Sequence, residues 1–153
     1  SSERKTIVNF SKLIDNIASS IRNLLKKENV EINTNFTAVE EINTISSYMY
    51  SIFYNLILNS IKYRQQGLAP VIEIKTEQCE DGIIITFKDN GMGIDLDKNG
   101  EHVFGLYKRF HRDIEGKGVG LFMVKTQVES LGGKITINSA INKGTEFKIR
   151  LYL

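Results

Sequence analysis

The sequence is poor in cysteine and proline, with one of each among 153 residues, and it has no tryptophan. A lone Cys79 excludes a disulfide framework and a cysteine-based metal cluster, and its strand-like surroundings favour a small buried thiol. No apolar run approaches the roughly 18 residues that a membrane-spanning helix needs, and no secretory signal opens the chain. We therefore expect a protein of the reducing cytoplasm, a location that is compatible with a membrane-anchored parent protein.

An excess of charge of either sign is also absent, since the formal net charge is +2. Such a small excess gives no argument for nucleic acid or a membrane surface as a partner. With 41% hydrophobic residues, the chain is long enough to build one proper core. We expect a single, monomeric domain over residues 1–153, in which residues 1–5 are a linker or a cloning remnant.

The most informative stretch, Ser46–Tyr63, has neither proline nor glycine and predicts a helix capped by Ser46. Apolar residues at helical spacing predict a buried stripe of Met49, Phe53, Leu56, Ile57 and Ile61. On the other side, Asn55, Asn59 and Lys62 follow the spacing i, i+4, i+7 and form a polar stripe. A buried amide needs a partner, because leaving it unpaired costs about 1–3 kcal/mol. The amides either cap neighbouring loops or, with the ammonium in register, form a site for a metal–phosphate group.

The rest of the chain predicts strands and helices in mixed order. Strands are expected at Thr6–Phe10, Val30–Phe36, Ile42–Ile45, Val71–Gln78, Gly82–Lys88, Lys134–Ser139 and Thr145–Tyr152. Helices are expected from Ser11, as the cap, to about Glu28, and over Val119–Leu131, before Gly132 and Gly133. Hairpins dominate the second half, which indicates an α+β fold with helices layered on one face of a mixed sheet.

Residues 90–117 form a polar segment whose length indicates a nucleotide loop and lid and not a plain connection. The segment follows Asp89, a carboxylate that can accept a hydrogen bond from an exocyclic amine. Gly91 and Gly93 let the backbone turn sharply beside a planar ligand, although the same residues suit an ordinary turn. At its far end, Gly116–Leu121 places three glycines at the start of a helix, where backbone N–H groups can face a phosphate. The glycine spacing fits neither a dinucleotide fingerprint nor a Walker loop.

The order of these features resembles the GHKL nucleotide-binding fold and, within it, the catalytic ATP-binding domain of sensor histidine kinases. Asn55–Tyr63 resembles the N box of that family, with Ser60 where alanine is commoner, and Asp89–Ile94 resembles the G1 box. Further matches are the F box in its phytochrome-like form at Val103–His111, the G2 box at Gly116–Leu121 and the terminal strand at Gly144–Phe147.

This resemblance extends from about Ile7 to the end and implies a Bergerat-type α/β sandwich with an ATP lid. Its sheet would be mixed and mostly antiparallel, with about five strands, and three helices would cover one face.

The resemblance also implies roles for single residues. Asn59 would ligate Mg²⁺ through its amide oxygen, Asn55 would support the same cluster, and Lys62 would reach a phosphate as a point charge. Asp89 would select adenine through its amine. The other residues placed around ATP are Tyr63, Gly91, Gly93, Ile94, Gly116, Lys117, Gly118, Val119, Gly120, Leu121 and Thr145.

The lid aromatics Phe104, Tyr107 and Phe110 would anchor the lid by packing and not by touching ATP. Arg109 and Arg112 either stabilise charge at the γ-phosphate or are simply solvated.

Two other GHKL classes are the alternatives: ATPases of the gyrase, mismatch-repair or ninety-kilodalton chaperone type, and stand-alone serine kinases of the anti-sigma type. These relatives carry a glutamate general base at the position of Asn55, and an amide takes no proton at neutral pH. This difference favours a histidine kinase, whose nucleophile is an imidazole. His102 and His111 both lie in the predicted lid, so the phosphoacceptor would stand on dimerisation helices of a parent kinase, with a response regulator downstream. We expect ATP and Mg²⁺ as cofactors and no autophosphorylation of the isolated chain.

Overall fold

The computed structural model describes residues 4–105 and 120–153. Its helices are α1 (Phe10–Ser20), α2 (Arg22–Lys27), α3 (Ser46–Lys62), α4 (Leu96–Asn99), α5 (Gly120–Ser130) and the 3-10 turn η1 (Gly100–His102). Its strands are β1 (Thr6–Asn9), β2 (Glu31–Asn35), β3 (Glu41–Thr44), β4 (Val71–Cys79), β5 (Gly82–Asp89), β6 (Lys134–Ser139) and β7 (Thr145–Tyr152). In this part of the chain, no helix has both the length and the apolar character needed to cross a membrane.

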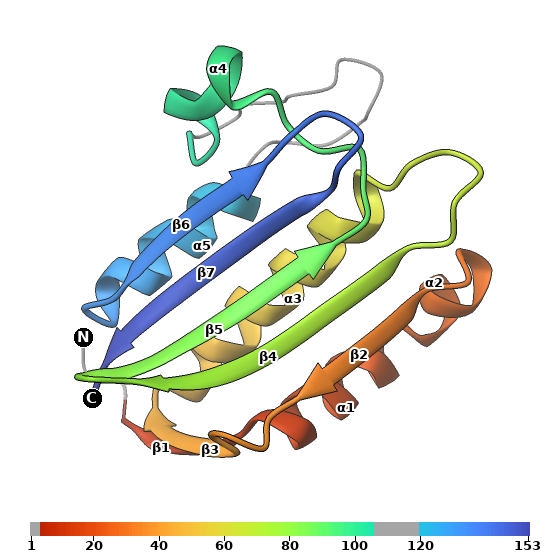
Figure 1. Cartoon of the computed structure of the whole chain (residues 1–153). Coiled ribbons are helices and arrows are strands. Elements are labelled where there is room, and N and C mark those ends of the chain that lie inside the picture. Colours follow the sequence, from red (N-terminus) through yellow and green to blue (C-terminus); the bar gives the residue numbers. More distant parts are fainter. Residues whose placement is uncertain (1–3, 106–119) are drawn as a thin grey trace.

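The main sheet has five strands in the order β2-β4-β5-β7-β6 (Figure 1). β2 pairs with β4 in parallel, and the other three pairs are antiparallel. The expected mixed, mostly antiparallel sheet is therefore confirmed. β1 and β3, also expected as strands, form a separate antiparallel pair instead of joining this sheet. The parallel pair needs a long crossover, and the chain supplies one through β3 and α3.

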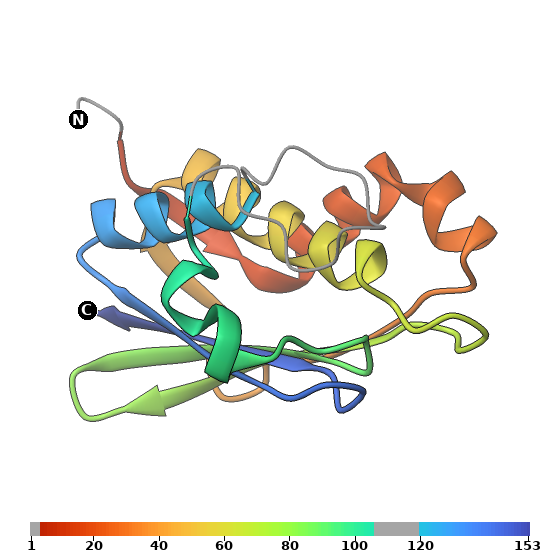
Figure 2. The ribbon, with the colours of Figure 1, turned by 90° about the horizontal axis from the view of Figure 1, so that it is seen from above.

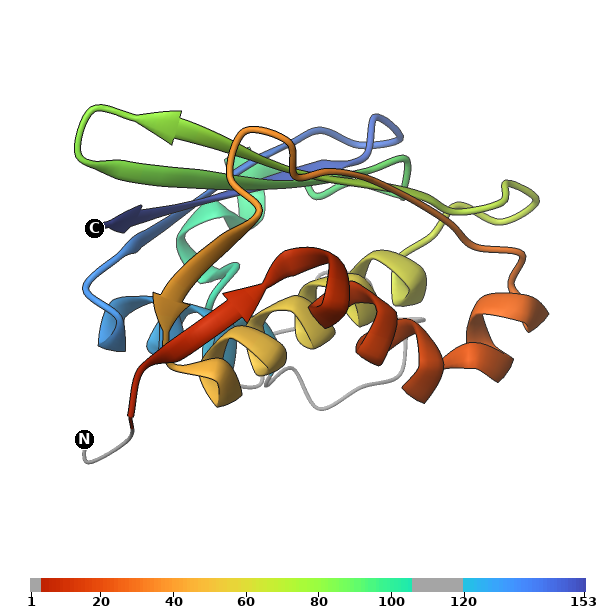
Figure 3. The same ribbon diagram turned by 90° about the horizontal axis from the view of Figure 1, so that it is seen from below.

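Helices α1, α3 and α5 all lie on one face of the main sheet (Figures 2 and 3). Alternation along β4 shows why, since Ile72 and Ile74 are buried while Glu73 and Lys75 are exposed. A strand with this period has one apolar face, and burying that face against helices is the main stabilising term. The fully buried Phe53 of α3 meets Phe87 of β5 edge-on, with ring centroids 4.8 Å apart.

The predicted helix starts were wrong at two places. α1 begins at Phe10, and its cap is Asn9, whose Oδ1 accepts a hydrogen bond from the Lys12 amide at 3.0 Å. The cap therefore lies two residues before the predicted Ser11 cap. Phe10, the first residue of the helix, is fully buried in the core. The chain breaks at Ile21, so the single expected helix is two. At α3, the N-cap residue is Ile45 and no side chain caps the helix, so Ser46 does not have its predicted role.

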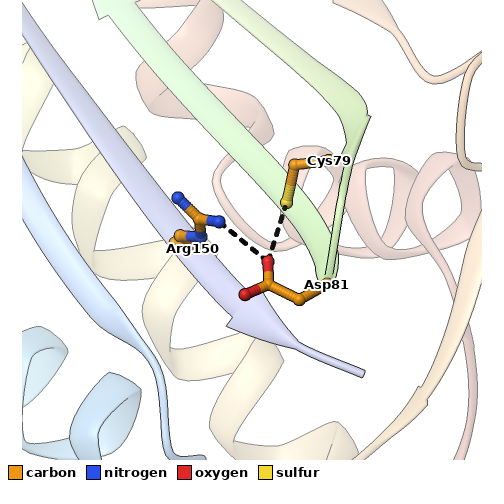
Figure 4. A network of polar contacts seen from close by, with 3 residues as sticks. All are labelled: Cys79, Asp81 and Arg150. Atoms are coloured by element: carbon orange, nitrogen blue, oxygen red, sulfur yellow. Dashed lines mark hydrogen bonds and ion pairs between the residues drawn. The ribbon is translucent and has the colours of Figure 1, made fainter.

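The turn between β4 and β5 is tied to β7 by a small polar cluster (Figure 4). Arg150 donates to Asp81 Oδ1 at 2.8 Å, and the Cys79 thiol donates to the same oxygen at 3.7 Å. The hydrogen bond from Arg150 lowers the pKa of the exposed Asp81. Cys79 is only half-buried, because it is the last residue of β4, where the strand leaves the core; the predicted buried thiol was wrong.

Candidate nucleotide-binding site

The site is organised by the 17-residue helix α3, whose apolar stripe is buried as predicted. Asn55, Asn59 and Lys62 are half-buried on the other side of the helix. The Asn55 amide nitrogen donates to the Ser51 carbonyl at 2.8 Å and to the Ser51 hydroxyl at 3.2 Å. This orientation turns Oδ1 of Asn55 toward the start of α5, where a Cβ on Gly120 would lie 3.4 Å from it. The N box residue and the last glycine of the G2 box are therefore neighbours in space.

One turn further along α3, the side-chain amide of Asn59 has no hydrogen-bond partner among the described residues. The Lys62 ammonium lies 5.5 Å from the centroid of the Tyr63 ring. Asn59 and Lys62 are three residues apart near the C-terminal end of α3, which places an amide and an ammonium on the same side of the helix. An amide oxygen suits Mg²⁺, and an ammonium group suits phosphate oxygens.

Asp89, the last residue of β5, is held by donors from three segments. Its Oδ1 accepts from the Gly91 amide at 2.9 Å and the Thr145 amide at 3.1 Å, and its Oδ2 accepts from the Ser60 hydroxyl at 2.7 Å. Burial raises the pKa of this carboxyl, while the hydrogen bonds from Ser60, Gly91 and Thr145 act in the opposite direction. The structure therefore joins the predicted Asp89, Gly91 and Thr145 in one hydrogen-bond network.

The glycines of the Asp89 turn serve close contacts between backbone segments. A Cβ on Gly91 would lie 2.7 Å from the Tyr63 carbonyl oxygen, which accepts a hydrogen bond from the Met92 amide at 2.8 Å. Gly93, with φ +74, packs in the same way against the Ala140 carbonyl. The sequence predicted that both glycines let the backbone turn sharply beside a planar ligand. In the structure, the absence of a side chain at each glycine also lets other backbone segments of the protein pack closely against it.

Four polar residues that hold this region together were missed as such from the sequence. Gln65 donates through Nε2 to the carbonyls of Asn90 at 3.1 Å and Gly91 at 3.2 Å. The Asn90 side chain accepts from the Val71 amide at 2.9 Å and donates to the Ala69 carbonyl at 3.1 Å. Ser139 and Ser60 complete the set.

Ser139 accepts from the Ile94 amide at 2.8 Å and donates to the Gly144 carbonyl at 2.9 Å. In the sequence, Ser60 stands out only as a departure from alanine, yet it lies four residues after Leu56 on the buried side of α3. A hydroxyl on an apolar stripe signals a buried partner, and that signal was present in the sequence.

The base of the expected lid is packed into the core. Ile94 and Val103 are buried, and the Phe104 ring meets Phe147 with centroids 6.1 Å apart. The Lys125 ammonium of α5 lies 5.6 Å from the Phe104 centroid. The packing role predicted for Phe104 is confirmed. The predicted loop also contains α4 and η1, which sequence periodicity did not indicate.

Several predicted residues cannot be placed. Tyr107, Arg109, Phe110, His111, Arg112, Gly116, Lys117, Gly118 and Val119 lie outside the described residues. Leu121, in the first turn of α5, is buried, and His102 is exposed.

Comparison with known proteins agrees with this geometry. The family model described as "Histidine kinase-, DNA gyrase B-, and HSP90-like ATPase" matches residues 44–153. The chain belongs to this family. Its fold is that of histidine kinase catalytic domains, and it is homologous to sensor histidine kinases.

Among curated relatives, the chain is 35% identical over 104 residues to cyanobacterial phytochrome A of a Nostoc species, which covers 67% of the chain and 13% of the relative. It is 41% identical over 91 residues to the methanogenesis regulatory histidine kinase FilI of Methanothrix harundinacea, covering 60% of the chain and 10% of the relative. It therefore spans only a small part of these longer proteins.

Two solved structures have the same fold. The mycobacterial sensor histidine kinase MprB superposes with a TM-score of 0.80 at 23% identity, covering 96% of this chain and 97% of that one. Full-length ShkA, solved in complex with AMPPNP, gives a TM-score of 0.81 at 18% identity over 97% of this chain and 31% of that one.

Proposed function

We propose that this domain binds Mg-ATP and positions its γ-phosphate for transfer to a histidine on a dimerisation domain outside this chain. The observation that carries the proposal is the Asp89 carboxylate. A carboxylate offers about four acceptor positions, and three of those of Asp89 are taken by Gly91, Thr145 and Ser60. The remaining position on Oδ2 suits a single N–H donor such as the exocyclic amine of adenine.

The phosphate-binding end of the proposed site lies on α3, the helix that carries Ser60. Successive residues of an α-helix project about 100° apart, so Asn59 and Ser60 face different directions from one turn of α3. Ser60 faces Asp89, which leaves Asn59 and Lys62 for the metal and the phosphates. The bound Mg²⁺ would neutralise phosphate charge, and Asn59 would hold it through the amide oxygen.

Asn55 supports a kinase and not a rapid ATPase. Its amide nitrogen is committed to Ser51, and its oxygen faces the start of α5. A neutral amide cannot remove a proton from water, and positioned general acid–base catalysis is typically worth 10²–10⁴-fold. Hydrolysis by this domain is therefore slow, and the acceptor imidazole supplies its own nucleophile.

Calorimetric titration of the chain with ATP, with and without Mg²⁺, tests the binding half of this proposal. We expect binding of modest affinity that strengthens when Mg²⁺ is present. Incubation with γ-labelled ATP tests the other half: the chain alone should hydrolyse slowly and stay unlabelled, while dimerisation helices of the parent kinase, added in trans, should gain acid-labile phosphate.

Two results would contradict this assignment. Fast steady hydrolysis would place the chain with the GHKL ATPases. Phosphate label on the unmutated chain that is lost in the His111→Gln variant would show that His111 is itself a phosphoacceptor. A response regulator as the next acceptor, a monomeric state and a cytoplasmic site follow from the same assignment and are part of the proposal.

A further inference from the structure

Ser60 is the residue of this site that the family pattern does not explain. It lies in the last turn of α3 with 5% of its surface exposed, and its hydroxyl donates to Asp89 Oδ2 at 2.7 Å. That separation is typical of a charge-assisted hydrogen bond from a hydroxyl to a carboxylate. A buried serine with this contact does more than fill the space of an alanine.

The geometry of the carboxylate shows what the contact does. Both backbone donors, Gly91 and Thr145, act on Oδ1 and so fix the position of that one oxygen. These two hydrogen bonds occupy the lone pairs of Oδ1 and leave those of Oδ2 for other donors. The bond from Ser60 occupies one lone pair of Oδ2 and so leaves a single direction from which this oxygen can accept another donor.

We propose that Ser60 is a positioning residue that sets adenine selectivity by aiming the free lone pair of Asp89 Oδ2 at the 6-amino group. This inference rests on the proposed nucleotide site and adds a specificity determinant to it. A fixed acceptor with one vacant position binds a base that places an N–H donor there more tightly than a base that has no donor, or a carbonyl, at that position. Asp89 is the group that touches the base, and Ser60 acts through it.

No ionic partner competes for this role among the described contacts of Asp89. Its neighbour along β5, Lys88, is exposed on the opposite face of the sheet, and Glu146 next to Thr145 in β7 alternates to that same face. On α3, Lys62 is half-buried two residues after Ser60 and belongs to the phosphate end of the site. The groups that face the carboxylate are therefore one hydroxyl and two backbone amides.

The test compares two nucleotides on two proteins. Affinity for ATP and for purine riboside triphosphate, which lacks the 6-amino group, is measured by calorimetry with Mg²⁺ on the parent chain and on Ser60→Ala. We expect Ser60→Ala to weaken ATP on the order of tenfold, the value of one hydrogen bond to a charged group, and to leave the analogue nearly unchanged. A merely structural role would weaken both nucleotides equally.

The matched control is Thr76→Val, which removes another buried hydroxyl, one that donates to the Val39 carbonyl at 2.7 Å far from Asp89. It should leave the preference for ATP intact. If Ser60→Ala does not fold, Ser60→Cys keeps the volume with a weaker donor and allows the same comparison.

Equal affinities of parent and variant for ATP, or an equal loss for both nucleotides, would overturn the role of Ser60. A parent chain that binds neither nucleotide would instead refute the proposed function itself.

Discussion

Gly93 lies so close to Ala140 that a Cβ on the glycine would stand 1.9 Å from the Ala140 carbonyl oxygen. This contact locks the turn after Asp89 onto the hairpin between β6 and β7. On the same hairpin, the Asn142 amide donates to the Met92 carbonyl at 2.7 Å. The adenine end of the proposed site therefore depends on backbone packing between segments that are far apart in the sequence.

Gly93→Ala should lower the free energy of unfolding by about 3 kcal/mol, because it adds left-handed strain to a backbone clash. Urea unfolding measures this loss. Gly67→Ala is the control: its φ is +77, but a Cβ there meets nothing within 4 Å. That variant should lose only about 1 kcal/mol. Equal losses for the two variants would show that the contact with Ala140 contributes nothing.

Asp89→Asn should keep the fold and weaken ATP about tenfold or more. The new amide oxygen can still accept from Gly91 and Thr145, and its NH₂ group can donate to Ser60, but it presents a donor where adenine also presents one. Preference for ATP over GTP should fall, since guanine offers a carbonyl at that position. A competition assay measures the ratio, and Asp81→Asn, in an exposed turn, is the control.

The pH dependence of ATP binding should report the buried carboxyl. Burial raises the pKa of Asp89 above 3.8, so affinity should fall as the pH falls through this raised value, because the protonated acid loses its acceptor. Calorimetry on the parent and on Asp89→Asn checks this, since titration of the nucleotide's own phosphates cancels in the ratio. A ratio that is constant with pH would contradict the prediction.

The sign for stability is opposite. In the window between 3.8 and the raised pKa, the folded chain binds more protons than the unfolded chain, so the free energy of unfolding decreases as the pH rises. Asp89→Asn removes this term. The variant should therefore gain stability relative to the parent with increasing pH across that window, as measured by urea unfolding.

Asn59→Ala should abolish the gain in ATP affinity that Mg²⁺ provides and should change the free energy of unfolding by less than about 1 kcal/mol, because the amide is half-buried on the polar side of α3. Calorimetry with and without Mg²⁺ measures the first effect. Asn16→Ala, at an exposed position of α1, is the matched control and should bind Mg-ATP like the parent. An Asn59→Ala chain that binds as tightly as the parent would remove the metal role.

Local sequence patterns were sufficient to predict most helices and strands and the order of the site motifs along the chain. The stripe from Met49 to Ile61 predicted α3 and its buried face, because a 3.6-residue period is a property of the local sequence. Strand alternation likewise predicted β4 to β7 almost to the residue. Local signals failed at the start of α1, where Phe10 is buried in the core, and at the break at Ile21.

The sequence by itself determined that Asp89 directly follows the predicted strand Gly82–Lys88 and that an amide-bearing helix precedes it. Only the tertiary structure decided that Ser60, 29 residues before Asp89, donates to it, and that Gly93 packs against the Ala140 carbonyl. Pairing across such distances depends on how α3 packs on the sheet and on how two loops meet. No periodicity encodes these contacts, because each one arises from the packing of whole elements.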